Sequence, residues 1–379
     1  MLERKSVSGF NMGFAGKFTQ VFGGATAILI IFMMYGVPVY LSYQISSIIE
    51  PVADSYLLIP LASALEGTAD ITQHFLMGDY GIVSLGLYSV VWALPVVLFI
   101  SLSISLTEGT GLQNKLINMT APLLRKIGLS GADYVPVISG YGCNVVAVLQ
   151  TKGCHACSRR QCVSMISYGS ACSYQIGATL SIFNAAKIPW MFIPYIMLLF
   201  IIGVLHTRLW YKKPPAIPFI NRNYALRKPD WAKVSKRWSG IVAPFFKQAL
   251  PIFLVICFFA FLLNESGFLL FLVQFSAPLF HLLSLPPESG LGIFFSVLRK
   301  DGILLFNEGG GSLLASFTAA EIFIVVYLAS TLSGCLVTLF TIAKELGCKF
   351  AISHTIKQAA TSVITAGILA AVFKFTGIM

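Results

Sequence analysis

The chain alternates between long apolar windows and short polar segments, and most apolar windows have the length of a membrane-spanning helix. A hydrocarbon layer of about 30 Å needs roughly 20 apolar residues in a helix. Windows near that length lie at 23–47, 82–106, 163–184, 189–206, 248–264, 268–285, 320–341 and 355–375. The windows 131–150 and 290–306 are broken by Gly, Ser and charged residues, which predicts re-entrant or discontinuous helices. The pattern predicts an all-α polytopic membrane protein with about eight transmembrane helices.

Composition supports the same class. Of the 379 residues, 56% are hydrophobic and 11% are charged, and the mean hydropathy is +0.81. A water-soluble core of this length does not use so much apolar surface. The first 17 residues carry Arg4, Lys5 and Lys17 and lack the apolar core of a signal peptide. We therefore expect residues 1–22 to be a cytoplasmic N-terminal segment.

Loop charges predict the orientation. Residues 49–81 hold five acidic residues and no Lys or Arg, whereas 207–247 hold ten Lys or Arg and the single acid Asp230. Lys and Arg are retained on the cytoplasmic side. We therefore expect 207–247 to be a basic cytoplasmic or interfacial loop between a first membrane half, 23–206, and a second, 248–379, in the inner or plasma membrane. The net charge of +11 then reflects topology and contact with the lipid bilayer, and no nucleic-acid partner is expected.

Two similar patterns occur in the two halves. In each, an acidic residue with glycine precedes a Gly-Cys pair by 33 or 34 positions: Glu108-Gly109 with Gly142-Cys143, and Asp301-Gly302 with Gly334-Cys335. Broken helices at matching positions of two repeats indicate a transporter's central site. The segment from Ser139 to Asn144 would fray a lipid-facing helix, so we expect it to line a path. The alternative is that its small residues only allow close helix packing.

Thiols and small oxygens are the candidate ligands of this path. The predicted path residues are Cys143, Asn144, Cys172, Ser173, Cys335, Glu108 and Asp301, with Cys143, Cys172 and Cys335 as the metal ligands. Borderline-soft Fe(II) accepts thiolate and carboxylate, whereas Mg(II) prefers oxygen and water. The alternatives are that each cysteine is only a small hydrophobic residue, and that each acid caps a helix or pairs with a neighbouring lysine.

A second cysteine cluster follows the first broken window. Cys154, His155, Cys157 and Cys162 fall within nine residues on the side predicted to be cytoplasmic, where a structural disulfide is not expected. The cluster lacks the separated ligand pairs of a closed zinc site and the βαβ context of a thioredoxin-like redox pair. We expect either an acceptor for metal that leaves the path or an ordinary polar turn.

Several motifs in a fixed order resemble the bacterial ferrous iron transporter B (FeoB) family over roughly residues 80 to 350. Those of the first Gate segment are Ala93-Leu-Pro95, Glu108-Gly-Thr-Gly111, the run from Lys126 to Pro136, and Ser139-Gly-Tyr-Gly-Cys-Asn144. The later ones are Ser170-Ala-Cys172-Ser173, Leu298-Arg-Lys-Asp301, Tyr327 to Cys335, and Lys344-Glu345-Leu-Gly347. The resemblance implies two Gate halves, iron transport and a GTPase domain. No Gly-x4-Gly-Lys-Ser/Thr phosphate loop occurs in the sequence, so we expect a membrane half without the GTPase.

Departures from the family pattern leave the substrate open. They are Val145-Val146 in place of Val-Pro, Tyr174-Gln175-Ile176 in place of Ala-Arg-Leu, Lys300-Asp301 in place of Lys-Glu, and Gly334-Cys335 in place of Pro-Cys. The leading expectation is an importer of a divalent transition metal, Fe(II) first. The alternatives are a transporter of an organic solute such as a nucleoside, because related Gate segments carry that description, and a membrane scaffold without transport.

Neither catalysis nor a resident cofactor is expected. No Ser-His-Asp, paired-carboxylate or zinc-protease arrangement stands out in the sequence. A separate GTPase or small cytoplasmic partner, and a homo-oligomer, are compatible with the pattern.

Overall fold

The computed structural model describes residues 14–78, 81–113, 115–116, 119, 129, 133–154, 158–211, 226–298, 300, 302–307 and 314–377. Every element in this part of the chain is a helix, which confirms the all-α prediction. Two shorter apolar helices accompany five helical stretches that are long and apolar enough to cross a membrane. The five are Leu29–Leu65, Asp70–Gly109, Pro189–Trp210, Ala319–Leu346 and Cys348–Phe375. The chain is therefore a multi-pass membrane protein.

The N-terminal helix is much longer than the predicted span. α1 (Phe14–Ala53) continues through a π-helical turn, η1 (Asp54–Leu58), into α2 (Ile59–Leu65), and α3 (Asp70–Met77) follows. The prediction of a loop over 49–81 is therefore wrong for most of its length. The acids of this segment are spread singly among Leu, Ile and Ala, so they do not interrupt the helix.

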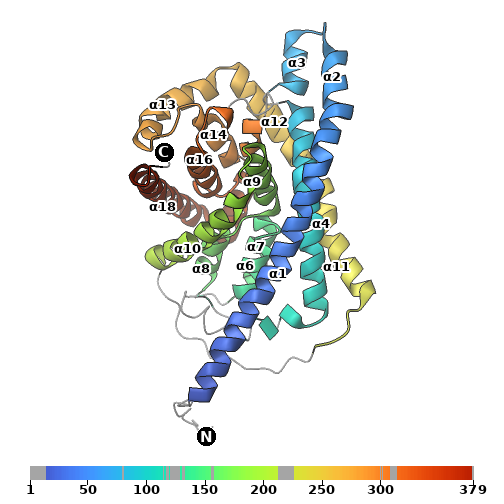
Figure 1. Cartoon of the computed structure of the whole chain (residues 1–379), viewed down its shortest axis with the longest axis vertical. Helices are drawn as coiled ribbons and strands as arrows, with labels where there is room; N and C mark the ends of the chain where they lie inside the picture. The colour runs from blue at the N-terminus through green and yellow to red at the C-terminus, as the bar shows by residue number, and fades with distance from the viewer. Residues whose placement is uncertain are drawn as a thin grey trace.

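α1 packs along α4 (Ile82–Gly109), and Figure 1 shows the two helices side by side. Two acids predicted to face solvent instead accept hydrogen bonds from α4: Glu50 from the Trp92 indole at 3.0 Å, and Asp54 from the Tyr88 hydroxyl at 3.1 Å. Charged groups inside an apolar layer are stabilised when they find such donors. These two hydrogen bonds hold the end of α1 and the turn η1 against α4.

Four short helices of the first half form two broken pairs. The first pair is α6 (Tyr134–Ser139) and α7 (Asn144–Gln150), and the second is α8 (Arg159–Gly169) and α9 (Ser173–Ala185). The interruption predicted within 131–150 is confirmed. The window 163–184, predicted as one span, is instead divided between α8 and α9, because Ser170, Ala171 and Cys172 leave the helical path.

The second half repeats this organisation. α14 (Ser289–Leu298) precedes the 3₁₀ segment η6 (Gly302–Asn307), which confirms the broken window at 290–306. α16 (Ala319–Thr331) and α17 (Leu336–Leu346) are separated at residues 332–335, so the predicted span 320–341 is also two helices. A capping box on Thr318 and Glu321 fixes the start of α16.

The remaining helices surround these broken pairs (Figure 1). They are α10 (Phe192–Trp210), α11 (Trp231–Pro244), α12 (Leu250–Glu265), α13 (Phe268–Leu282) and α18 (Cys348–Phe375). α11 lies inside the predicted basic loop, begins at an Asp230 side-chain cap, and packs on α4 through a bond from the Trp238 indole to the Leu98 carbonyl at 3.0 Å. Part of that loop is thus an amphipathic helix bound to the protein.

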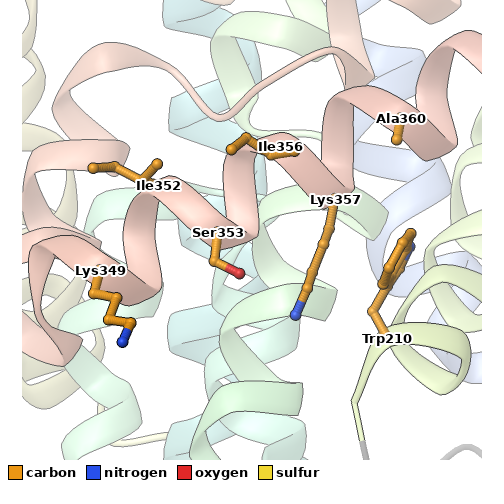
Figure 2. A pocket seen from close by; sticks show the side chains of 7 residues that line it. All are labelled: Trp210, Lys349, Ile352, Ser353, Ile356, Lys357 and Ala360. Atoms are coloured by element: carbon orange, nitrogen blue, oxygen red, sulfur yellow. The ribbon is translucent and has the colours of Figure 1, made fainter.

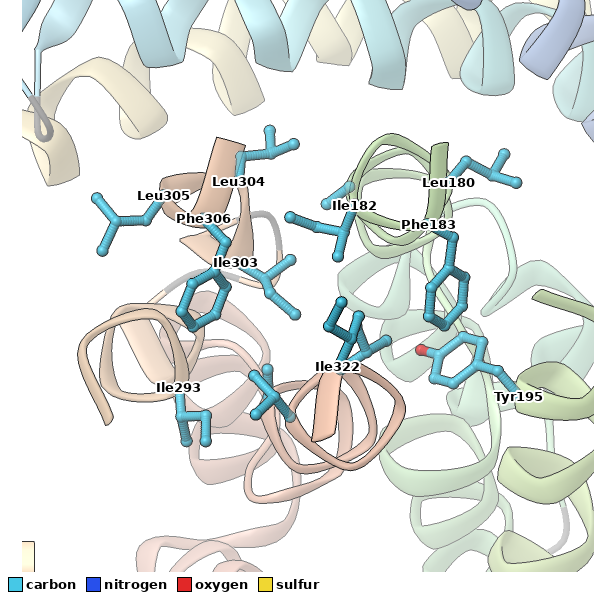
Figure 3. Packing of buried hydrophobic residues seen from close by; sticks show 14 of the residues in the cluster. Leu180, Ile182, Phe183, Tyr195, Ile293, Ile303, Leu304, Leu305, Phe306 and Ile322 are labelled. Carbon is cyan, nitrogen blue, oxygen red and sulfur yellow. The ribbon is translucent and has the colours of Figure 1, made fainter. Parts of the chain in front are cut away.

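The largest apolar core joins the two halves. Figure 3 shows Phe183 of α9, Phe306 of η6 and Ile322 of α16 converging in one cluster, which also includes Tyr195 of α10. α9 approaches α4 very closely, since a Cβ on Gly177 would lie 2.7 Å from the Trp92 carbonyl oxygen. This close approach packs α9 tightly against α4 next to the break between α8 and α9.

Candidate functional site

The tip between α6 and α7 is bound to the break between α8 and α9. The Gly142 carbonyl accepts bonds from the Ser173 backbone N–H at 3.1 Å and the Ser173 hydroxyl at 2.8 Å. The Tyr141 hydroxyl donates to the Gly169 carbonyl at 3.3 Å. A Cβ on Gly140 would lie 2.9 Å from the Ser170 side chain, so a larger residue there would push the two segments apart. Sequence motifs 30 residues apart thus form one structural unit.

The three cysteines predicted as ligands share one structural position. Cys143, Cys172 and Cys335 are the extended residues immediately before α7, α9 and α17. The first backbone N–H groups of a helix have no intrahelical acceptor and carry partial positive charge. Each thiol therefore lies at the electropositive start of a half-helix.

A buried lysine holds the break between α16 and α17. The Lys300 ammonium donates to the carbonyls of Ala329 at 3.2 Å and Ser330 at 2.7 Å, and also to that of Ser333. It is 3% exposed, and Cys172 and Cys335 are titratable groups in its surroundings. A cation at this point satisfies the last carbonyls of α16, which the break leaves without helical donors. Cys172 and Cys335, 163 positions apart in the sequence, therefore lie around one charge.

Sequence reasoning named Lys300 only as a neighbour that could pair with an acid. The signal that could have identified it is the lysine itself, because a charge within an apolar window is costly and therefore usually functional.

Asn144 has no hydrogen-bond partner in the described part of the chain. It begins α7, is 3% exposed, and neither its Oδ1 nor its Nδ2 finds a partner. A buried amide without partners costs about 1–3 kcal/mol, so such groups usually contact a ligand or water. Its neighbour Cys143 lies in the tip between α6 and α7, directly before Asn144. This amide is the clearest unfilled polar position among the predicted path residues.

Of the two predicted acids, the structure describes only Glu108. Glu108 lies at the end of α4, half exposed, and accepts a bond from the Arg237 guanidinium at 3.1 Å. Asp301 lies outside the described residues. The acid part of the predicted repeat therefore stays a prediction, whereas its two Gly-Cys pairs lie in different kinds of break, before α7 and before α17. The matching segments are Ser170-Ala-Cys172 and Ser333-Gly-Cys335, which break α8–α9 and α16–α17.

Side chains from α18 and α16 hold the two broken pairs together. The buried Gln358 amide donates to the Ser167 carbonyl at 3.2 Å and the Thr331 carbonyl at 3.0 Å, and accepts from the Ser167 hydroxyl at 2.8 Å. The hydroxyls of Tyr168 and Tyr327 share a bond of 2.7 Å. One glutamine thus binds the ends of both α8 and α16.

Replacing Gln358 by leucine should lower the melting temperature of the purified protein clearly, because two buried carbonyls and one hydroxyl lose their partner at about 1–3 kcal/mol each. Differential scanning fluorimetry in detergent measures the change. Gln44→Leu, at an exposed position on α1, is the control and should shift little. Equal melting temperatures for the two variants would contradict this assignment.

The second predicted cluster is partly assembled. Cys154 and Cys162 are brought together, with their sulfur atoms 3.8 Å apart, and Asp133 joins them. Sequence reasoning missed Asp133, which precedes the cysteines by more than 20 positions. His155 and Cys157 lie outside the described residues.

A surface groove of about 730 Å³ lies away from the breaks. Figure 2 shows it along α18, lined by Lys349, Ile352, Ile356 and Lys357, with the Trp210 ring at one end. The Lys357 ammonium lies 5.7 Å from the centre of that ring. Cations beside aromatic rings and exposed isoleucines are typical of a surface at the membrane interface.

Comparisons with known proteins agree with the broken-helix architecture. Residues 90–186 match the Gate family model, described as nucleoside recognition. The chain is 31% identical over 112 residues to the Fe(2+) transporter FeoB of Helicobacter pylori, covering 30% of this chain and 17% of that protein. It is 26% identical over 182 residues to the FeoB of Legionella pneumophila, covering 46% and 24%. The matched stretches thus span about a quarter or less of these relatives.

Solved structures of CNTnw share the fold over nearly the whole chain. The inward-facing, substrate-bound state aligns with a TM-score of 0.53 over 93% of this chain and 99% of CNTnw, at 13% identity. An outward-facing CNTnw variant aligns with a TM-score of 0.52 over 94% and 99%.

The fold and the paired breaks define a multi-pass membrane protein built on broken helices. More particularly, the chain carries a Gate domain and is similar in sequence to the FeoB ferrous iron transporters, which confirms the resemblance read from its motifs.

Proposed function

We propose that this chain imports a divalent transition metal, Fe(II) first, through the region where its broken helices meet. The observation that supports the proposal is the placement of Cys143, Cys172 and Cys335 directly before three half-helices, although their sulfur atoms do not all lie within 4.8 Å of one another in this structure. Sulfur ligands suit Fe(II) and exclude Mg(II) and Ca(II) as preferred substrates. Similarity to proteins named Fe(2+) transporter supports the same substrate.

Electrostatics make downhill import possible without a nucleotide. A divalent cation that enters a negative interior gains about 2.3 kcal/mol per charge per 100 mV, or roughly 4–5 kcal/mol. The protein must replace the water ligands of the ion, since losing them without compensation costs far more. The thiols, with Asn144 and Ser173 as oxygen donors, supply that replacement.

The conformational change that we propose is an alternation between outward-facing and inward-facing states, as the two CNTnw states with the same fold illustrate. In this cycle the four short helices around the breaks move against the outer helices. The basic segment 207–247 faces the cytoplasm, with the N-terminal segment 1–22 on the same side. A separate GTPase or small cytoplasmic protein would dock on that face.

The test is uptake by proteoliposomes that contain the purified chain. Under anaerobic conditions and an inside-negative potential, we expect accumulation of Fe(II) above protein-free vesicles, with Mn(II) and Zn(II) compared at equal concentration. Radiolabelled uridine is measured in parallel. Uptake of uridine without metal would replace the proposed substrate by an organic solute, and no flux of either would favour a scaffold.

The organic-solute alternative has one observation in its favour. The buried amide of Asn144 offers both a donor and an acceptor, which matches a polar uncharged ligand better than a cation. The Gate model's description as nucleoside recognition agrees with it. For such a substrate, Asn144→Ala should abolish uptake, while Cys143→Ser and Cys172→Ser should leave it nearly unchanged.

A further inference from the structure

A second cluster of metal-binding side chains lies beside the path, where three segments meet. Asp133 immediately precedes α6, Cys154 follows the 3₁₀ turn η3 (Thr151–Gly153), and Cys162 lies in α8. One carboxylate oxygen and the two sulfur atoms all lie within 4.8 Å of one another. Asp133 and Cys162 are fully buried, and Cys154 is half-buried.

The spacing of these atoms fits a metal ion. Two thiolates on a tetrahedral ion with metal–sulfur bonds of about 2.3 Å are about 3.8 Å apart. The Cys154 and Cys162 sulfur atoms are 3.8 Å apart without an ion. The protein therefore already holds the pair at the separation that binding requires.

Hydrogen bonds orient the carboxylate. The Ser158 hydroxyl donates to Asp133 Oδ1 at 2.9 Å, and the Cys162 thiol contacts the Asp133 backbone carbonyl at 3.8 Å. Outer contacts of this kind fix ligands in position and raise metal affinity. The apolar cluster around Cys162, including Val163 and Ile166, excludes water from one side.

We propose that Asp133, Cys154 and Cys162 form a binding site for a thiophilic divalent ion such as Zn(II), Fe(II) or Co(II). Two sulfur donors disfavour Mg(II) and Ca(II). Three protein ligands leave a fourth position for water or an exchanging ligand, as in open metal sites. Cys162 lies seven residues before the end of α8 at Gly169, or about 10 Å along the helix, so the site is separate from the path thiols.

The location gives the site an effect on the broken helices. Two basic residues next to the site form ion pairs with Glu345 of α17. They are Lys152 of η3, at 2.9 Å, and Arg159, the first residue of α8, at 2.8 Å. A bound ion would therefore tie the base of the first broken pair at a point already joined to the second half.

The experiment is an anaerobic Co(II) titration of the full chain carrying Cys143→Ser, Cys172→Ser and Cys335→Ser, so that the path thiols cannot bind. We expect about one equivalent of Co(II) with sulfur-to-cobalt charge-transfer absorption and tetrahedral visible bands. Adding Cys162→Ser or Cys154→Ser should remove the charge-transfer band, and Asp133→Asn should weaken binding at least roughly tenfold. Cys257→Ser and Cys348→Ser are the controls and should change nothing.

Because the readout is binding by a chain without path thiols, it is independent of whether the protein imports metal. Gel filtration checks that each variant is folded, and Cys154→Ser, at the half-buried position, serves if Cys162→Ser aggregates. The proposal would be overturned if the charge-transfer band were absent, or if it survived all three substitutions. It would also be overturned if the intact mass of the reduced sample were lower by two hydrogen atoms, which would indicate a Cys154–Cys162 disulfide.

Discussion

Cys172→Ser is expected to reduce Fe(II) uptake into proteoliposomes by roughly 100-fold, because a proposed metal ligand is lost and even the loss of an outer contact to a ligand costs about 10–100-fold in metal affinity. Serine keeps the size of the side chain, so the buried position beside the Ser173–Gly142 bonds should still pack. Initial uptake rates at equal reconstituted protein measure the effect.

Cys257→Ser is the matched control, since Cys257 is also fully buried but lies in α12 within the apolar core. Its uptake should remain close to that of the unchanged protein. Equal rates for the Cys172 and Cys257 variants would show that the thiol at the α8–α9 break is not a ligand.

Lys300→Met should abolish uptake and lower thermal stability together. The change keeps an unbranched side chain but removes the donor from three buried carbonyls at the α16–α17 break, each worth about 1–3 kcal/mol when unpaired. Melting temperature and uptake are measured on the same preparation. Lys374→Met, at an exposed position near the end of α18, should alter neither.

A Lys300→Met protein with unchanged melting and uptake would mean that the ammonium does not hold the break. Lys300→Arg refines the result, because guanidinium keeps the charge but has a planar donor geometry unlike an ammonium. It should retain more stability than the methionine variant while transport still falls.

The helical class and the first broken segment could be predicted from the sequence alone. Long apolar windows indicate spanning helices, and the two glycines near Cys143 indicate a break in one of them. Both features depend on neighbouring residues and not on distant ones. The three cysteines named from the sequence share one structural position, directly before half-helices, and their role as ligands stays a prediction.

The match between the two halves could be read from the sequence only in part. Glu108 with Gly109 matched Asp301 with Gly302 as dipeptides, but short matches carry no information about helix register. The structural repeat aligns Ser170-Ala-Cys172 with Ser333-Gly-Cys335, each at the same place in a broken helix. This match is present in the sequence, but it is only three residues long and therefore easily overlooked.

Contacts between distant segments account for the other misses. Gln358 in α18 is an ordinary polar residue in the sequence, and only folding brings it to the carbonyls of Ser167 and Thr331. Asp133 joins Cys154 and Cys162 for the same reason. The helix over 49–65 was mistaken for a loop because its acids were counted without the α4 donors that accommodate them.

The most direct test of metal binding on the path is X-ray absorption spectroscopy of Zn(II) bound to the Cys154→Ser/Cys162→Ser protein, in which Cys143, Cys172 and Cys335 are the thiols proposed to bind the ion. We expect the spectrum to show sulfur neighbours of the ion at about 2.3 Å. These neighbours should disappear when Cys143, Cys172 and Cys335 are also replaced by serine. A spectrum with nitrogen and oxygen neighbours alone, or one unchanged by those three replacements, would contradict this expectation.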